Sequence, residues 1–205
     1  MSKREVRKHI RKVLNTLSDA RLESQSTCVA EQLRALKCYR EASNVSVYLS
    51  MPKEELRTLQ ILANAHSDGK RVFIPRITLS KENSNYIGDR SDHLTMLLQS
   101  EAQIAQLRPR GKYALLEPQN YEPSLDAANC GGLDLVVVPG MAFTQNGARL
   151  GHGKGYYDDY IKRHEIITGR RPVLVGVALQ EQILESLPLE GHDEKLDYVL
   201  VATKS

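Results

Sequence analysis

The stretch DLVVVPGMAFTQNGARLGHGKGYYDDY, residues 134–160, decides how this chain folds. Its first five residues, DLVVV, form an apolar, β-branched run of the kind found in buried parallel strands. Pro139-Gly140 ends the run, because proline cannot donate a ladder hydrogen bond and the pair marks a turn. Glycines recur between 147 and 155, and YYDDYI, residues 156–161, has the composition of a helix start. The stretch therefore predicts a strand, a glycine-rich loop and a helix, in that order.

A glycine-rich loop between a strand and a helix predicts an anion site. Glycines let backbone N–H groups crowd around a phosphate, and the helix N-terminus adds roughly half a positive charge. Arg149, His152 and Lys154 add side-chain donors to the same loop. The plainer alternative is a tight strand-to-helix turn, but a turn alone does not require four glycines and three basic side chains.

Two common phosphate motifs do not fit this loop. A P-loop would need glycine where Ala148 stands and serine or threonine where Gly155 stands. The dinucleotide fingerprint fails too, because the glycines at 151, 153 and 155 alternate and lie late in the chain. A hydride-transferring Rossmann enzyme is therefore disfavoured.

Composition limits the other functions. A length of 205 residues predicts a single domain over 1–205, and a net charge of +3 is too small to favour nucleic acid as a partner. No apolar run is long enough to span a membrane or to serve as the core of a signal peptide. Three cysteines without CxxC spacing argue against a disulfide framework or a zinc site, so a reducing cytoplasm is the simplest location.

Hydrophobic periodicity places elements along the rest of the chain. We expect helices over 3–17, 19–39, 54–65, 101–107 and 181–187. We expect strands over 44–50, 71–74, 94–98, 134–138, 173–179 and 197–202, with Pro75 ending the second of them. The alternation predicts an α/β fold: one domain with a mainly parallel, Rossmann-like sheet flanked by helices.

The loop sequence RLGHGKGYYD, residues 149–158, preceded by PGMAF, resembles the signature of 5-formyltetrahydrofolate cyclo-ligases, also called methenyltetrahydrofolate synthetases. The resemblance extends over nearly the whole chain through KREVR (3–7), VSVYLSMPKEELRT (45–58), RVFIPR (71–76), EP (117–118) and HDEKLD (192–197). It implies an ATP- and Mg²⁺-dependent enzyme that converts 5-formyltetrahydrofolate to 5,10-methenyltetrahydrofolate with release of ADP and phosphate.

The resemblance also implies which residues form the site. It assigns nucleotide binding to Lys3, Arg7, Arg149, Leu150, Gly151, His152, Gly153, Lys154, Gly155, Tyr156 and Tyr157. It assigns the folate to Leu49, Met51, Glu55 and Tyr113, with the Glu55 carboxylate accepting hydrogen bonds from the pterin ring. It assigns the metal to Asp158 and Asp193, with Asp197 as an alternative second carboxylate.

Each of these residues also has a plainer interpretation. Asp158 could serve only the helix N-terminus, worth about 0.3–1 kcal/mol, although Mg²⁺ commonly takes one or two carboxylates together with substrate phosphates. Glu55 could be a helix-start charge, Tyr113 a half-buried aromatic, and the basic face of the first helix a solvated surface. The histidines other than His152 are expected at the surface: His9, His66, His93, His164 and His192.

The expected partners are small molecules. We expect a monomer that binds ATP and 5-formyltetrahydrofolate, including forms with a polyglutamate tail, and that has no nucleic-acid or membrane partner. The basic first helix is similar to a mitochondrial presequence, but KREVR begins two residues after the start and leaves no room for a removable leader. The alternative is a non-catalytic nucleotide- or RNA-binding protein of the same fold, which the intact glycine loop and Asp158 disfavour.

Overall fold

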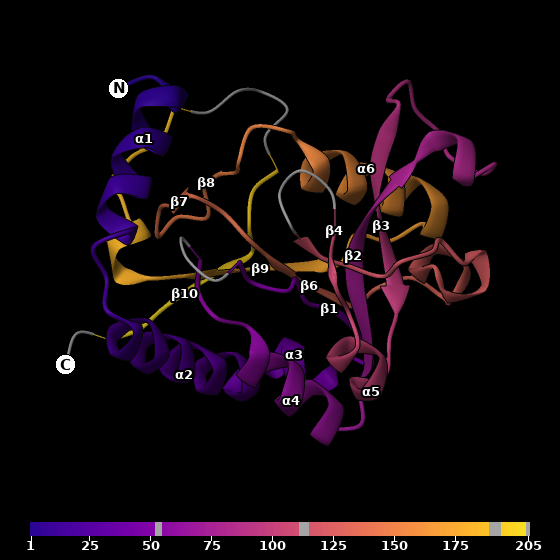
Figure 1. Ribbon diagram of the computed structural model, residues 1–205, viewed down its shortest axis with the longest axis horizontal. Coiled ribbons are helices and arrows are strands. Elements are labelled where there is room, and N and C mark those ends of the chain that lie inside the picture. The colour runs from indigo at the N-terminus through magenta and orange to yellow at the C-terminus, as the bar shows by residue number, and fades with distance from the viewer. Residues whose placement is uncertain (52–54, 111–114, 189–193, 204–205) are drawn as a thin grey trace.

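A six-stranded sheet forms the centre of the molecule (Figure 1). The computed structural model describes residues 1–51, 55–110, 115–188 and 194–203. Within them the strands of this sheet follow the order β10-β9-β6-β1-β2-β3, and only β3 is antiparallel to its neighbour. Their bounds are β1 (Asn44–Ser46), β2 (Arg71–Leu79), β3 (Asp92–Leu98), β6 (Leu135–Val138), β9 (Val173–Ala178) and β10 (Tyr198–Val201). The α/β prediction with a mainly parallel sheet is confirmed.

Helices cover both faces of the sheet, and the central strand β6 shows why. Its alternate residues belong to different cores: Leu135 and Val137 pack with one cluster, Val136 and Val138 with the other. The first core lies under α1 (Lys3–Leu14), α2 (Asp19–Ala35) and α4 (Leu59–Ser67), and the second under α6 (Tyr156–Thr168). A parallel strand that is buried on both faces is expected to be a continuous apolar run, as LVVV, residues 135–138, is.

Short elements connect these layers. They comprise α3 (Lys37–Glu41), α5 (Glu101–Ala105), the antiparallel pairs β4 (Pro109–Arg110) with β5 (Leu115–Leu116) and β7 (Ala142–Phe143) with β8 (Arg149–Leu150), and four 3₁₀ turns at Ser80–Glu82, Pro123–Leu125, Ala127–Asn129 and Gln180–Gln182. The β7–β8 hairpin carries the chain from the end of β6 back to the glycine loop, so the loop and α6 begin beside the strand that precedes them.

Several predicted helix bounds were wrong for local reasons. The helix predicted over 19–39 breaks at Leu36, whose backbone is extended, and α3 follows. The helix predicted from 54 begins only at Leu59, because Thr58 donates its hydroxyl to the carbonyl of Tyr48. The helix predicted over 181–187 is reduced to a 3₁₀ turn, after which the N–H of Leu184 donates to the carbonyl of Phe143.

The prediction that Pro75 ends its strand was also wrong. β2 continues to Leu79, and its residues 73–79 pair with β3. On its other edge β2 pairs with β1 from Arg71 to Phe73 and no farther. The missing N–H of Pro75 therefore interrupts no ladder on that edge. Proline is tolerated in a strand where one edge has no neighbour. This unpaired stretch of β2 forms part of the wall of the site described below.

The expected surface position of His93 and His164 was wrong as well. The two side chains are 0% and 2% exposed, because α6 packs over the β3 side of the sheet. The Nε2 atom of His164 accepts a hydrogen bond from the N–H of Leu133 at 2.8 Å. Burial lowers the pKa of His93 to about 4 and also lowers the pKa of His164. Both rings therefore act as neutral structural groups at pH 7.

Candidate active site

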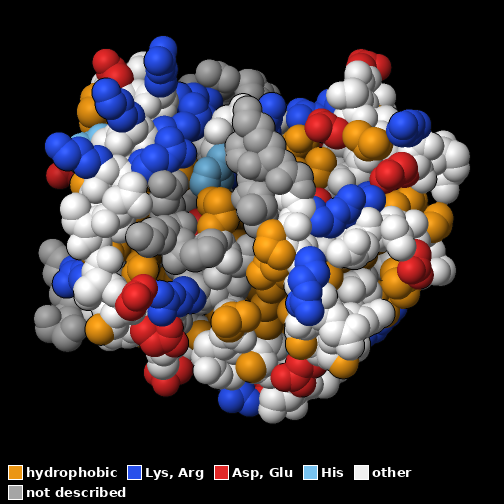
Figure 2. Space-filling view, in the orientation of Figure 1, with side chains coloured by type: hydrophobic (Ala, Val, Ile, Leu, Met, Phe, Trp, Pro, Cys, Tyr) orange, Lys and Arg blue, Asp and Glu red, His pale blue; other side chains and the backbone are white. Residues whose placement is uncertain are grey.

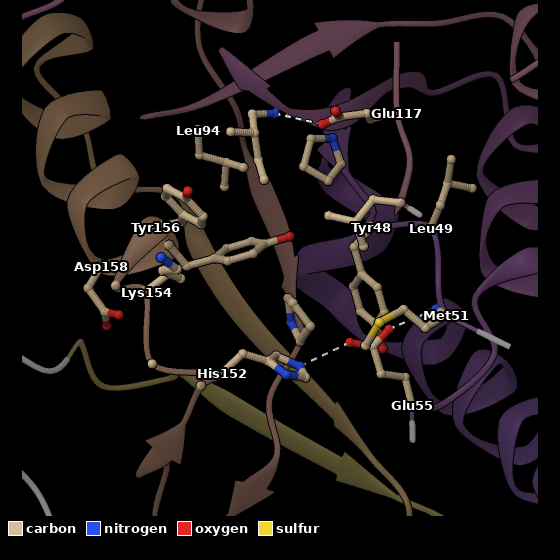
Figure 3. Close-up of a pocket in the computed structure, with 18 of the residues that line it drawn as sticks. Tyr48, Leu49, Met51, Glu55, Leu94, Glu117, His152, Lys154, Tyr156 and Asp158 are labelled. Carbon is tan, nitrogen blue, oxygen red and sulfur yellow. Dashed lines mark hydrogen bonds and ion pairs between the residues drawn. The ribbon is translucent and has the colours of Figure 1, made fainter. Parts of the chain in front are cut away.

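A cavity of about 570 Å³ opens beyond the carboxyl ends of β1 and β6 and beside the middle of β2, at the edge where α/β sheets bind ligands (Figure 3). The glycine loop and the start of α6 form one wall. The segment after β1 and the unpaired edge of β2 form the other. The lining residues are Arg11, Tyr48, Leu49, Met51, Glu55, Pro75, Ile77, Leu94, Leu115, Leu116, Glu117, Pro139, Arg149, Gly151, His152, Gly153, Lys154, Gly155, Tyr156, Tyr157 and Asp158.

The glycine loop ends as a helix N-terminus facing the cavity. Gly153 and Gly155 have φ of 102° and 66°, a left-handed backbone that disfavours any side chain. Gly155 is the N-cap of α6 and has no side chain to cap the first-turn N–H groups. These N–H groups are available to an anion, and the helix dipole favours negative charge at the same place. Lys154 lines the cavity between the two glycines.

Behind the loop, Arg149 and Asp158 form an ion pair in which one guanidinium nitrogen bonds both carboxylate oxygens. Both carboxylate oxygens of Asp158 accept from Nη2 of Arg149 at 2.9 Å, and one also accepts the N–H of Glu194 at 3.1 Å. The two side chains are only 6% and 16% exposed. The Nε atom of Arg149 is buried and has no hydrogen-bond partner among the described residues. The pair therefore places a cation beside the cavity with one donor that binds nothing in the described part of the chain.

Helix α1 meets the same loop. The Nε atom of Arg7 donates to the carbonyl of Gly151 at 2.8 Å, and a Cβ on Gly153 would lie 3.4 Å from the guanidinium carbon of Arg7. That distance is an ordinary van der Waals contact, so the left-handed backbone of Gly153, and not the approach of α1, is what favours glycine there. Lys3 lies one turn before Arg7 on α1, and Arg11 lies one turn after it and lines the cavity.

The opposite wall presents a buried carboxylate. Glu55 is 7% exposed, and its Oε2 atom accepts the N–H of Met51 at 2.9 Å. Its Oε1 atom lies 3.2 Å from Nε2 of His152, so a side chain of the glycine loop touches the facing wall (Figure 3). Tyr48, Leu49 and Met51 supply apolar contact area around Glu55. A flat ligand with N–H donors at one end matches this wall, because the carboxylate accepts hydrogen bonds and the flanking side chains are apolar.

Comparison with known proteins agrees with this geometry. Residues 1–202 match the 5-formyltetrahydrofolate cyclo-ligase family. The chain belongs to this family. It is 37% identical to the 5-formyltetrahydrofolate cyclo-ligase of Saccharomyces cerevisiae over 97% of this chain and 94% of the yeast protein. It is 32% identical to the mouse cyclo-ligase over 97% of this chain and 93% of that protein. The solved 5,10-methenyltetrahydrofolate synthetase of Aquifex aeolicus superimposes with a TM-score of 0.70 at 26% identity, covering 98% of this chain and 89% of that chain.

Most residues that the family resemblance singled out come together in the cavity. Those that line it are Leu49, Met51, Glu55, Arg149, Gly151, His152, Gly153, Lys154, Gly155, Tyr156, Tyr157 and Asp158. Leu150 does not line it, since its side chain is 2% exposed and packs into the first core. Arg7 contacts the loop from α1, and Lys3 lies one turn earlier on the same helix. Tyr113 and Asp193 fall outside the described residues. Asp197 accepts from the N–H of Leu174 at 2.7 Å and pairs with Arg171, which ties it to the sheet edge.

Glu117 was given no role from the sequence, yet it is a second buried carboxylate in this cavity. Its Oε2 atom accepts the N–H of Ile77 at 2.8 Å, which satisfies the unpaired edge of β2 past Pro75. Arg76, 3% exposed, fixes the neighbouring backbone by donating from Nε to the carbonyl of Pro118. Burial raises the pKa of Glu117. The Glu-Pro pair at 117–118 was the available signal, but only the strand register shows its partner.

A metal ion at this site would have to be coordinated partly by a bound nucleotide. Among the described residues, no three His, Cys, Asp or Glu side chains are grouped so that they could hold a metal ion. Asp158 is the one residue of the predicted metal pair that the structure describes, and it lies on the glycine-loop wall. Mg²⁺ often binds through one or two carboxylates plus substrate phosphates, so Asp158 beside a phosphate site fits that ion chemically. No helix of the described chain is long and apolar enough to cross a membrane.

Proposed function

We propose that this protein catalyses the ATP-dependent conversion of 5-formyltetrahydrofolate to 5,10-methenyltetrahydrofolate. The observation that carries the proposal is the pairing of two unlike walls in one cavity. A glycine-rich helix N-terminus suits phosphate, a buried carboxylate suits a pterin, and the His152–Glu55 contact shows that the walls touch. The curated relatives from yeast and mouse carry the name 5-formyltetrahydrofolate cyclo-ligase.

The nucleotide occupies the glycine-loop wall in this proposal. First-turn N–H groups of α6 and the ammonium of Lys154 contact phosphate oxygens. Arg7, held by the carbonyl of Gly151, and Lys3 one turn earlier add positive charge from α1. Arg149 turns its unused Nε donor toward the phosphates. Tyr156 and Tyr157 provide flat faces near the loop, and the partial burial of Tyr157 raises the pKa of its phenol, which stays protonated.

The folate occupies the facing wall. Ring N–H groups of the pterin donate to the Glu55 carboxylate, whose second hydrogen bond, from Met51, keeps it oriented. Tyr48, Leu49 and Met51 contact the ring faces. Tyr113 as a stacking aromatic beside the folate remains a prediction. With the pterin on Glu55 and the phosphates on the loop, the formyl group lies between the walls.

The chemistry then requires little from the protein beyond placement and charge. The formyl oxygen attacks the terminal phosphorus of ATP and ADP leaves, giving an imino-phosphate. The nitrogen that bridges pteridine and benzoate attacks the same carbon and loses its proton, and phosphate departs with the C–O bonding electrons. Holding these groups in reach, and neutralising charge that develops on the phosphoryl oxygens, are the two effects that lower the barrier. No covalent protein intermediate is needed.

Mg²⁺ is part of the proposal. Asp158 would hold it together with ATP phosphates, and the ion would neutralise phosphate charge when bound. Because both oxygens of Asp158 now bind Arg149, we expect Arg149 to exchange this carboxylate for a phosphate when the nucleotide binds. Such an exchange keeps both charges paired throughout, which avoids the large cost of a lone buried charge. The second carboxylate is left open between Asp193 and Asp197.

The proposal is tested by incubating the purified protein with ATP, Mg²⁺ and 5-formyltetrahydrofolate and following the absorbance of the methenyl product. We expect product in proportion to ADP released, and none without ATP. Nucleotide binding without turnover would instead favour a non-catalytic binder of the same fold. Light scattering on the same sample would test the expected monomer, and the cytoplasmic location stays a prediction.

A further inference from the structure

One side chain of the glycine loop occupies the carboxylate that faces it across the cavity. The Nε2 atom of His152 lies 3.2 Å from Oε1 of Glu55, while the other carboxylate oxygen accepts the N–H of Met51. Figure 3 shows the imidazole ring reaching across the cavity to Glu55. The Glu55 side chain is 7% exposed and the His152 side chain 35%, so the ring lies between the buried carboxylate and the opening. A flat ligand that donates to Oε1 must take the place of this ring.

His152 belongs to the segment that forms the anion site. It lies between Gly151 and Gly153, shortly before the N-cap of α6. The loop backbone is fixed on both sides of it, because Arg7 binds the carbonyl of Gly151 and Gly153 has a left-handed φ of 102°. Lys and Arg side chains gather over α1 beside the loop, which makes this side attractive to phosphate (Figure 2). A rotation about the side-chain bonds of His152 takes its ring away from Glu55 without a change in the loop backbone.

A phosphate offers His152 the same kind of partner that Glu55 does. Both are oxyanions that accept an N–H bond, so the ring can exchange one for the other and stay hydrogen-bonded. Glu55 then has an acceptor oxygen open to a ligand. Arg149 is expected to make a similar exchange, from Asp158 to a phosphate. The arrival of a nucleotide would thus release two carboxylates, one on each wall.

We propose that His152 couples the two substrate sites: it holds Glu55 while the phosphate site is empty and releases it when a nucleotide binds. The proposal rests on the proposed function, because that function supplies both ligands. His152 is then a positioning residue for the folate, since it acts through Glu55. A nucleotide should raise the affinity for 5-formyltetrahydrofolate, and the folate should raise the affinity for the nucleotide by the same factor. A partly exposed contact of this kind sets the factor at about fivefold.

The experiment measures the affinity for 5-formyltetrahydrofolate by calorimetry, with and without Mg²⁺ and a non-hydrolysable ATP analogue. In wild type we expect the analogue to tighten folate binding about fivefold. In His152→Ala, which empties Oε1 of Glu55, folate alone should bind about fivefold more tightly than it does to wild type, and the analogue should add little. His152→Gln should restore part of the coupling, because its amide can donate to either anion. His9→Ala, at an exposed histidine outside the cavity lining, is the matched control and should behave as wild type.

A substitution in the nucleotide loop that tightens folate binding is a result that lost packing cannot give. Coupling that persists in His152→Ala would overturn the proposal, because other residues would then carry it. Folate affinity in that variant at or below the wild-type value, without nucleotide, would show that the ring does not obstruct Glu55 and would overturn it as well. The ring-proton NMR signal of His152 in wild type gives a second test that needs no variant to fold: the analogue alone should shift it, and an unmoved signal would contradict the exchange.

The same titrations separate this proposal from the proposed function. Wild type that binds no folate, with or without the analogue, would contradict the proposed function. Wild type that binds folate equally well in both states would contradict only the coupling through His152.

Discussion

The two walls of the cavity are built in opposite ways. The glycine-loop wall comes from a short run of sequence, residues 149–158, in which a hairpin strand, a loop and a helix start follow each other directly. The folate wall collects Leu49, Glu55, Ile77, Leu94 and Glu117, which are far apart in sequence and lie on different elements. A binding surface of local origin can be recognised from a motif, whereas a surface of distant origin depends on strand order and register.

The walls also differ in electrostatics. On the loop wall the partly buried carboxylate Asp158 has a full cationic partner in Arg149. On the folate wall the buried carboxylates Glu55 and Glu117 each accept a backbone N–H, and Glu55 also contacts Nε2 of His152. A charge that is already paired can exchange partners when an anion arrives. A carboxylate oriented by one N–H keeps acceptor capacity for donors on a ligand. The difference matches a phosphate on one side and a pterin on the other.

The largest effect is expected for Asp158→Asn, which removes the charge that Mg²⁺ needs. Turnover should fall about a hundredfold or more, as when one major electrostatic contact is lost, and added Mg²⁺ should recover part of it. The measurement is a Mg²⁺ titration of the cyclisation rate. Asp159→Asn is the matched control, because Asp159 pairs with Arg163 in the same helical turn, away from the cavity lining. An unchanged Mg²⁺ dependence in the Asp158 variant would remove this residue as a metal ligand.

Arg149→Ala should weaken ATP binding by about ten- to hundredfold while folate affinity stays close to wild type. It should also lower the free energy of unfolding by a few kcal/mol, on the order of 3, because Asp158 loses its partner in a largely buried position. Calorimetry and chemical denaturation measure the two effects. The control is Arg163→Ala, which breaks a similar buried pair with Asp159 and should cost stability without changing ATP affinity. Equal loss of ATP affinity in both variants would contradict a phosphate role.

The local wall was predictable because its signals are local. Glycines at positions that need a left-handed backbone, a strand before them and a helix start after them predict an anion site without knowledge of the fold. Even there, the motif did not predict which side chains are buried. Leu150 lies within the motif but points into the core, since alternate residues of β8 face opposite sides. The ion pair of Arg149 with Asp158 depends on how β8 and α6 lie against each other, which the motif does not show.

The distant wall and parts of the fold depended on information outside the local sequence. A proline usually ends a strand, yet β2 continues past Pro75. It can do so because β1 pairs with β2 only as far as Phe73 and leaves the edge beyond Phe73 open. The role of Glu117 follows from that open edge. His93 is buried because α6 packs over the β3 side of the sheet, and a histidine beside Asp92 at the start of a strand carries no sign of such a cover. Strand order and packing decide these features, and neither can be inferred from a short segment of the sequence.

A smaller effect is expected for Glu55→Gln on the folate wall. The amide oxygen can still accept the N–H of Met51, so the fold should be kept, but the charge and one acceptor for the pterin are lost. The KM for 5-formyltetrahydrofolate should rise about tenfold with the ATP KM nearly unchanged. Steady-state kinetics with each substrate varied in turn gives both values. Glu181→Gln, a partly buried carboxylate outside the cavity lining, is the control. An unchanged folate KM would return Glu55 to a structural role.

The smallest effect concerns stability, and it tests whether the folate wall stores an unfavourable charge. Burial raises the pKa of Glu117 in the folded protein, so the folded state binds its proton more tightly than the unfolded state does. The stability linked to this proton is fully present below the unfolded pKa and is lost as the pH rises through the folded pKa. At pH 7 the ionised carboxylate therefore destabilises the fold relative to a neutral group of the same shape.

Glu117→Gln supplies that neutral group and keeps an acceptor for the N–H of Ile77. We expect the variant to be more stable than wild type at pH 7 by less than about 1 kcal/mol. The difference should shrink toward zero as the pH falls below the unfolded pKa of glutamate. Denaturant titrations at a series of pH values measure it, and Glu185→Gln, which removes a carboxylate outside the cavity lining, is the control. If the variant were less stable than wild type at every pH, the Glu117 carboxylate would be a net structural support. If it is more stable at pH 7 but binds folate more weakly, the wall keeps a costly charge because the substrate needs it.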